Sequence, residues 1–176
     1  GEQGENLHKD LKEVLIPDHK RKAGRKKEIE NVIEMKVFRR LRRSQMDPAI
    51  KEYDCTWAEK MKGSDCRSRL VVRQFNNKER DDVYASTPNP LSLMLMLALA
   101  CAKKYKVRTG DVSVAFLHAL AEELMYLTPP AEDKEHSEIQ DEEYVWGLDK
   151  AMYGQRTAPK AWQKYWAENL TKLGYA

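Results

Sequence analysis

The segment STPNPLSLMLMLALACAKKYK holds the longest apolar run of the chain, residues 91–102, which only Ser92 interrupts. Ser, Thr, Asn and Pro residues directly before the run are typical of a helix start, so we predict a helix of about a dozen residues. Because this helix would be apolar on nearly all sides, it is expected to lie in a core, with Met94 and Met96 as packing residues. The run is shorter than the roughly 18 to 20 apolar residues of a membrane-spanning helix, so no membrane segment is predicted.

The composition predicts a globular protein with a core of modest size: 41% of the 176 residues are hydrophobic and 34% are charged. Such a chain fits one domain or two small lobes. The cysteines, Cys55, Cys66 and Cys101, have no CxxC spacing and no histidine at zinc-finger distance, which favours reduced thiols in an intracellular protein over a disulfide framework or a zinc site. The first residue is Gly1 and no signal-peptide pattern follows it, so we expect a piece of a longer chain.

The net charge of +3 conceals an uneven distribution, with basic residues gathered before position 75 and acidic residues after position 131. Residues 1–27 carry a basic cluster that Pro17 and Gly24 interrupt, and we expect a flexible N-terminal arm there. An RNA-contacting or nuclear-import patch is the alternative. Residues 28–43 have apolar side chains at helical spacing and arginines near their end, which predicts an amphipathic helix.

Residues 55–75 are predicted to form a β-hairpin with its turn at KGSD. Since side chains alternate between the two faces of a strand, Arg67, Arg69 and Arg73 would share one face, opposite Leu70 and Val72. One interpretation is an exposed strand whose cations aid solubility. The other is a phosphate-binding platform, because the planar guanidinium group binds phosphate through two parallel hydrogen bonds.

The segment GDVSVAFLHAL places Asp111 among small and apolar residues, and Val107 to Phe116 is predicted to be a strand. A lone aspartate buried among valines would cost several kcal/mol unless it is paired or binds a cation. Asp111 is therefore expected to meet a metal ion, an arginine, or water at a strand end.

Three segments together, RSRLVVRQF, TGDVSVAFLHALAEELMYLTPP and WGLDKAMYGQRTAPKAW, resemble in this order and spacing the reverse transcriptase domain of copia-type LTR retrotransposons. The resemblance extends from about Glu28 to the end of the chain and is strongest over residues 67–176. The chain departs from the family pattern at His118-Ala119, where Asn-Gly is common, and at Gln155-Arg156-Thr157, where Leu-Lys-Gln is common.

The resemblance implies a catalytic site. Asp111 matches one of three carboxylates that hold two Mg²⁺ ions, for which Mn²⁺ is a possible substitute, and the backbone carbonyl of Val112 matches a further metal ligand. Phe116 matches a steric gate that selects deoxynucleotides by leaving no room for a ribose 2′-hydroxyl. Arg69 and Arg73 would reach the triphosphate of the incoming nucleotide.

The YGQRTAPKAW segment would lie beneath the templating base pair, with Tyr153 and Gly154 near the nucleotide. Pro159 is expected near the first turn of the following helix. The spacing of Trp162, Trp166 and Leu170 predicts a buried stripe on that helix.

The implied fold is α+β: fingers over residues 28–105, and an incomplete palm over residues 106–176 with an antiparallel sheet and packed helices. An open sheet edge would promote self-association. The acidic stretch 131–143 is expected to be a surface loop that faces away from the template, since its carboxylates would repel phosphate groups.

The resemblance also implies an RNA-directed DNA polymerase whose aromatic-x-Asp-Asp element, a further part of the metal site, has no counterpart in these residues. This chain alone is therefore expected to be inactive. In the complete enzyme its partners would be an RNA or DNA template-primer, dNTPs, and the remaining palm, thumb and RNase H parts of a Pol polyprotein, in a cytoplasmic particle or the nucleus. The alternative is a degenerate or domesticated transposon remnant that binds nucleic acid without catalysis.

Overall fold

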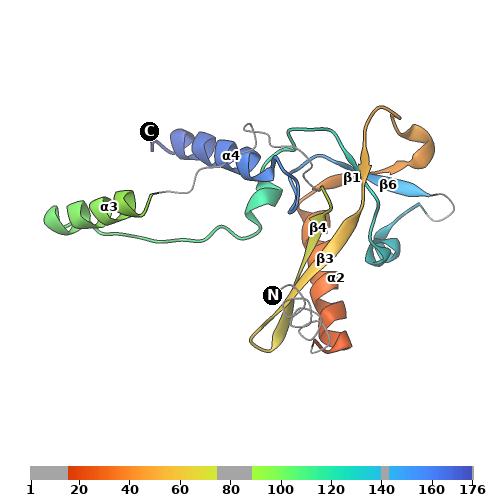
Figure 1. The fold of residues 1–176 in the computed structure, drawn as a ribbon, viewed down its shortest axis with the longest axis horizontal. Helices are drawn as coiled ribbons and strands as arrows, with labels where there is room; N and C mark the ends of the chain where they lie inside the picture. The colour runs from red at the N-terminus through yellow and green to blue at the C-terminus, as the bar shows by residue number, and fades with distance from the viewer. Residues whose placement is uncertain (1–15, 75–88, 140–142, 176) are drawn as a thin grey trace, which may run out of the picture.

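The computed structural model describes residues 16–74, 89–139 and 143–175, and it confirms the α+β class (Figure 1). Helices and strands follow one another in the order α2 (Asp18–Glu34), β1 (Phe38–Arg42), η1 (Arg43–Gln45), β2 (Glu52–Tyr53), β3 (Cys55–Lys62), β4 (Asp65–Val72), α3 (Pro90–Ala102), η3 (Ala115–His118), β5 (Tyr126–Leu127), η4 (Ala131–His136), β6 (Tyr144–Leu148) and α4 (Ala158–Lys172). No helix among the described residues is long and apolar enough to cross a membrane.

The described strands form a four-stranded sheet in the order β1-β6-β5-β2 and a two-stranded sheet, β3-β4. The larger sheet is mixed rather than antiparallel throughout, because β2 and β5 run parallel. The β3-β4 hairpin is the one predicted from the sequence. Its β4 strand alternates as expected, with Arg67 and Arg69 on the more open face and Ser68 and Leu70 buried.

Helix α2 packs along β4 and begins ten residues earlier than the sequence indicated. Residues 18–27, predicted to be part of a flexible arm, form its first half. Gly24 allows the close approach, since a Cβ atom there would lie 2.5 Å from the carbonyl oxygen of Cys66 and 2.7 Å from Ser68 Oγ.

The predicted helix over residues 28–43 is wrong beyond Glu34. The chain turns at Lys36, which has a left-handed φ of 53°, and residues 38–42 then pair as β1 with β6. Hydrogen bonding to β6 overrides the helical spacing of Val37 and Leu41, because tertiary context outweighs a local preference. The arginines of this segment do not lie in the last turn of α2. Arg39 pairs with Asp149, and Arg43 pairs with Glu52.

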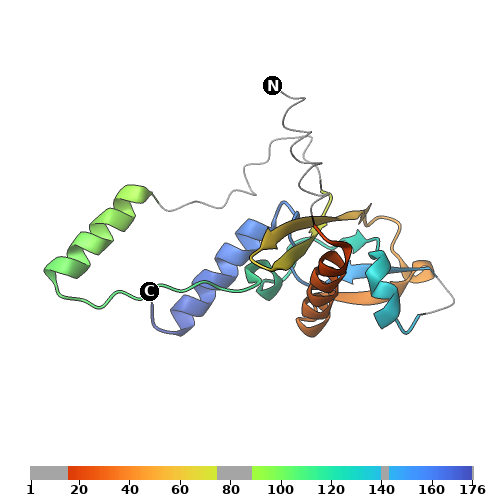
Figure 2. The ribbon, with the colours of Figure 1, turned by 90° about the horizontal axis from the view of Figure 1, so that it is seen from below.

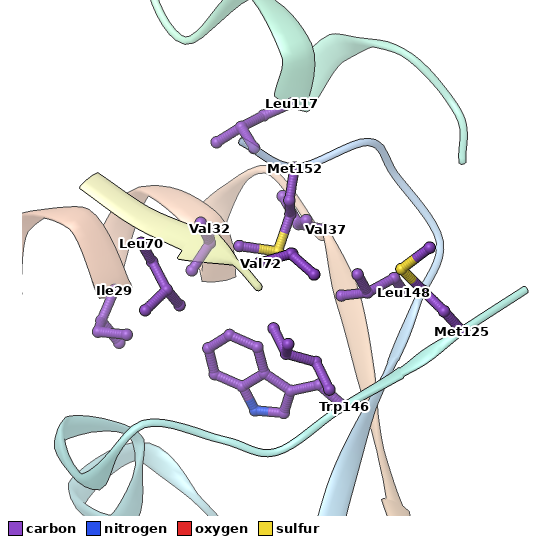
Figure 3. Packing of buried hydrophobic residues seen from close by; sticks show 11 residues of the cluster. Ile29, Val32, Val37, Leu70, Val72, Leu117, Met125, Trp146, Leu148 and Met152 are labelled. Atoms are coloured by element: carbon purple, nitrogen blue, oxygen red, sulfur yellow. The ribbon is translucent and has the colours of Figure 1, made fainter. Parts of the chain in front are cut away.

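The main core lies between α2, β4 and the larger sheet (Figure 3). Trp146 is fully buried in it, and its ring stacks on Phe38 with a centroid separation of 3.7 Å. The other buried members come from segments far apart in the sequence; they are Ile29, Val32, Val37, Leu70, Val72, Leu117, Met125, Leu127, Leu148 and Met152. This cluster therefore fixes the hairpin, η3 and the segment around Met152, between β6 and α4, relative to one another.

Asp133 belongs to the acidic stretch 131–143, which was predicted to be a surface loop, but it is buried. Its side chain has no exposed surface, and it accepts hydrogen bonds from Arg40, from the Tyr144 hydroxyl at 2.9 Å and from Trp146 Nε1 at 2.8 Å. The surface-loop prediction is wrong at this residue, because three donors compensate for the loss of water around the carboxylate.

Replacing Asp133 with alanine should destabilise the fold by about 3–5 kcal/mol, because the Arg40 guanidinium would lose its buried partner. Urea unfolding measures this loss. Glu135→Ala is the matched control, since Glu135 is exposed in the same η4 turn and its removal should change the free energy of unfolding by less than about 0.5 kcal/mol. Equal effects of the two substitutions would contradict the role assigned to Asp133.

Helix α3 forms as predicted but is not in a core. The Asn89 side chain caps its first turn by accepting a hydrogen bond from the Leu91 amide, and Pro90 occupies a first-turn position. Only Ala100 of the helix is buried, whereas Leu95 is 70% exposed and Leu99 is 54% exposed. Figures 1 and 2 show α3 standing apart from the two sheets. The expectation of a buried helix is therefore wrong for these described residues, since nothing among them covers its apolar sides.

An exposed apolar helix should promote association of the chain with itself. We expect sedimentation velocity to show concentration-dependent oligomers, and the double substitution Leu95→Lys, Leu99→Lys to shift the chain toward the monomer. Ser92→Lys adds a charge to the same exposed helix without removing apolar surface and serves as the control. A wild-type chain that stays monomeric at high concentration would refute the expectation.

Candidate functional site

Arg69 lies on β4 with its guanidinium group held by two neighbours. Arg69 Nη1 donates to Glu28 Oε2 on α2 at 2.8 Å and to the carbonyl oxygen of Ser68 at 3.3 Å. The guanidinium carbon also lies over the Tyr153 ring, 5.3 Å from its centroid, at the distance of a cation–π contact. Two residues that the sequence assigned to a nucleotide site, Arg69 and Tyr153, are therefore in contact.

Tyr153 is positioned by a close approach of its loop to β4. The carbonyl oxygen of Tyr153 accepts a hydrogen bond from the Val72 amide at 2.8 Å. Gly154 has a φ of +86°, and a Cβ atom at this position would lie 2.3 Å from the carbonyl oxygen of Val72. Only glycine fits there, because the conformation and the space both exclude a side chain. Gly154 thus serves the site by allowing this contact.

Phe116 completes the cluster from a third segment. It lies in the short η3 turn, half-buried, with its ring centroid 5.3 Å from that of Tyr153 and the two planes tilted by 57°. Arg69, Tyr153 and Phe116 therefore form a continuous cluster, which we call the cation–aromatic cluster. Burial raises the pKa of the Tyr153 phenol, and the Arg69 cation opposes this rise, so the hydroxyl is neutral at pH 7.

Arg73 lies just after β4 and is exposed. Its backbone amide donates to the carbonyl oxygen of Asp54 at 2.8 Å, which continues the hairpin pairing by one residue. The predicted alternation thus brings Arg69 into the cluster and leaves Arg73 at the exposed end of the strand.

Asp111 and Val112 lie in coil, not in the predicted strand. Asp111 is exposed and Val112 is half-buried, and the chain turns at Val114, which has a left-handed φ of 48°, before η3 begins. The strand prediction for residues 107–116 is wrong because a strand needs a hydrogen-bonded neighbour, and no described strand lies alongside this segment. Exposure to water also removes the need for a partner that was inferred for a buried Asp111.

The described residues contain no group of three or more His, Cys, Asp or Glu side chains placed to hold a metal ion. Asp111 and the carbonyl oxygen of Val112 have the oxygen donors that Mg²⁺ accepts. One carboxylate is too few for a two-metal centre, so the residues described here do not by themselves fit that group.

The aromatic stripe predicted on α4 is only partly buried. Pro159 occupies the first turn of the helix, as expected. However, Trp166 is 43% exposed, and the buried contact of α4 is made by Ala158 and Ala161. Small residues at this contact let α4 approach η3 closely, which leaves the larger rings at the side of the helix.

Glu28 is the site residue that sequence reasoning missed. It is 1% exposed and comes from α2, 41 residues before the arginine that it binds. A signal was present in the sequence, because Glu28 lies four residues before the buried Val32 and thus on the apolar face of the helix. A carboxylate on such a face requires a buried partner.

Comparisons with known proteins give a consistent result. Residues 48–176 match the family model described as reverse transcriptase (RNA-dependent DNA polymerase). The chain is 32% identical over 118 residues to the retrovirus-related Pol polyprotein from transposon TNT 1-94 of Nicotiana tabacum, a match that covers 61% of this chain and 9% of that protein. It is 30% identical over 115 residues to the Pol polyproteins from transposons RE2 and RE1 of Arabidopsis thaliana, covering 62% of this chain.

The chain therefore spans less than a tenth of the length of these curated relatives, since the matches cover 9%, 8% and 7% of them. No solved structure matches the chain.

Replacing Glu28 with glutamine should remove a pH-dependent loss of stability. Burial raises the pKa of the Glu28 carboxyl, and the Arg69 cation opposes this only in part. The folded chain then keeps the proton at pH values where the unfolded chain has lost it. The stabilising contribution is present below the ordinary pKa of 4.5 and is lost as the pH rises through the raised value.

Urea unfolding of the wild type and of Glu28→Gln, from below pH 4.5 to neutral pH, measures this change. The free energy of unfolding of the wild type relative to the variant should fall over that interval. A difference that stays constant with pH would show that the folded and unfolded carboxyls titrate alike.

Proposed function

Because this chain belongs to the reverse transcriptase (RNA-dependent DNA polymerase) family, we propose that it forms the nucleotide-binding part of the RNA-directed DNA polymerase of a copia-type retrotransposon. The observation that carries this proposal is the cation–aromatic cluster. Arg69, Tyr153 and Phe116 come from three separate segments and meet through contacts of 5.3 Å each. The cluster offers one cation and two aromatic rings, which suit the phosphate and sugar parts of a nucleotide.

Arg69 binds the triphosphate in this proposal, and Arg73 reaches it from the exposed end of β4. A guanidinium group is suited to this role because it keeps its charge and presents parallel donors to phosphate oxygens. Gly154 keeps the Tyr153 loop against the strand, so that the tyrosine ring lies beneath the arginine. The hairpin and α2 then act as fingers, and β5, β6 and α4 belong to the beginning of a palm.

Phe116 selects the sugar by exclusion. Its ring packs against Tyr153 and would occupy the space that a ribose 2′-hydroxyl needs. An unfavourable contact of this kind costs roughly 1–3 kcal/mol in a packed site. Discrimination against ribonucleotides by about 5- to 150-fold follows from that cost.

A two-metal site requires more carboxylate ligands than the described residues supply. Asp111 and the Val112 carbonyl are the proposed oxygen ligands, and Mg²⁺, or Mn²⁺ in its place, would neutralise charge on the phosphates when bound. Further carboxylates have to come from outside the described residues. Template-primer binding and nucleotide transfer are accordingly proposed for a longer Pol polyprotein that also carries the remaining palm, the thumb and an RNase H part.

The test of nucleotide binding compares dGTP with GTP. Equilibrium dialysis should give a lower dissociation constant for dGTP than for GTP in the wild type, by about 5- to 150-fold. Phe116→Ala should bind both nucleotides with nearly equal affinity, because it opens space for the 2′-hydroxyl.

Trp166→Ala is the matched control for removal of an aromatic side chain. Trp166 is 43% exposed on α4, and its loss should leave the ratio of the two constants unchanged. Equal binding of dGTP and GTP by the wild type would contradict the gate. A wild-type chain that binds neither nucleotide would contradict the proposed site.

A further inference from the structure

We propose that Glu28 is a positioning residue that holds the Arg69 guanidinium ready for a nucleotide phosphate. The inference rests on the proposed function, since it takes Arg69 to be the phosphate ligand. Glu28 does not touch the nucleotide in this arrangement. It acts through the arginine, from a helix that the sequence assigns to no part of the site.

The contact between the two side chains fixes one edge of the guanidinium. Glu28 Oε2 accepts from Arg69 Nη1 at 2.8 Å, and the carbonyl oxygen of Ser68 accepts from the same nitrogen at 3.3 Å. Both of these contacts use Nη1, so neither Glu28 nor Ser68 engages the Nε–Nη2 edge of this arginine. We assign this second edge, which can donate two parallel hydrogen bonds, to the phosphate.

Tyr153 fixes the face of the same group. Its ring lies 5.3 Å from the guanidinium carbon, so the plane is constrained as well as the edge. A long side chain held on an edge and a face has lost most of its rotamer freedom before any ligand arrives. Ordering a rotamer-rich side chain on binding costs about 0.5–1.5 kcal/mol, so this arrangement should strengthen phosphate binding by about 2- to 12-fold.

Glu28 is suited to this task because burial keeps its carboxylate in place beside Arg69. It is 1% exposed, lies on the buried face of α2 between helix and strand, and has neighbours Ile29 and Val32 in the core. A competing carboxylate on the surface would swing away when phosphate binds. A carboxylate fixed in the core instead stays on Nη1 and leaves the second edge to the ligand.

Arg67 provides an internal comparison. It lies on the same face of β4, is exposed, and has no carboxylate partner of its own among the described residues. Positive charge alone on this face would not require a buried carboxylate bonded to Arg69. The buried carboxylate, Glu28, is bonded to the arginine that contacts Tyr153.

Glu59 provides the control for a purely structural role. Like Glu28 it is a buried carboxylate between α2 and the hairpin, with a side chain 7% exposed, and it pairs with Arg21 at 3.1 Å and Arg25 at 2.8 Å. Those arginines do not contact the cation–aromatic cluster in any described interaction. Glu59 also accepts from Ser68 Oγ at 3.2 Å, and glutamine can keep that hydrogen bond through its amide oxygen. Glu59→Gln should therefore change stability without changing nucleotide affinity.

The experiment measures dGTP binding by equilibrium dialysis for the wild type, Glu28→Gln, Arg69→Gln, the double variant and Glu59→Gln, with circular dichroism to confirm folding. Glu28→Gln should weaken dGTP binding by about 2- to 12-fold. Arg69→Gln should weaken it further, and adding Glu28→Gln to that variant should have no additional effect. Affinity unchanged in Glu59→Gln completes the expected pattern.

Each other pattern overturns the inference. If Arg69→Gln binds weakly and Glu28→Gln binds like the wild type or more tightly, Glu28 does not position the arginine, although the proposed function stands. If Glu28→Gln weakens binding equally with and without Arg69, it acts through general stability. If Arg69→Gln binds like the wild type, the proposed function fails together with the inference.

Arg69→Lys keeps the test decisive if Glu28→Gln does not fold. Lysine retains the charge and can pair with Glu28, but its ammonium group has no second rigid edge for phosphate. We expect its dGTP affinity to be as low as that of Arg69→Gln. Wild-type affinity in Arg69→Lys would show that an oriented second edge is not needed.

Discussion

The close packing of α2 on β4 is the constraint on which the rest of the structure depends. Gly24 allows it, since any side chain there would meet the backbone of Cys66 at 2.5 Å. The approach brings Glu28 over Arg69 and places Ile29 and Val32 in the core. Strand β4 in turn holds the Tyr153 loop through Val72. The position of the cation–aromatic cluster thus follows from how near a helix lies to a strand.

Buried carboxylates organise this arrangement. Glu28, Glu59 and Asp133 each lie beneath the surface, and each accepts hydrogen bonds from at least one arginine. Such pairs add little net stability when desolvation is counted, but the loss of one partner is costly. They therefore specify which segments meet more than they strengthen the fold. Asp133 joins β1 to β6, whereas Glu28 and Glu59 join α2 to the hairpin.

The sequence predicted the features whose causes are local. The hairpin and the alternation of Arg67 and Arg69 follow from a period of two along β4, and the start of α3 follows from Asn89 and Pro90. Features set by distant partners were not predictable in this way. Residues 38–42 have helical spacing yet pair with β6. Asp133 does not differ in sequence from the other acidic residues of its stretch, and contacts such as the hydrogen bond from Trp146 distinguish it only in the structure.

The residues of the candidate site also differ in whether a local sequence pattern or a distant contact identifies them. Short motifs were enough to assign Tyr153, Phe116 and Arg69 to one candidate site. The three side chains are in contact in the structure. Glu28 belongs to no such pattern, and its contact with Arg69 depends on the path of α2 across the hairpin. Asp111 shows the reverse case, since its motif is clear while the described residues give it no partner strand. A motif identifies the groups that we propose for the chemistry, and packing identifies the groups that hold them in place.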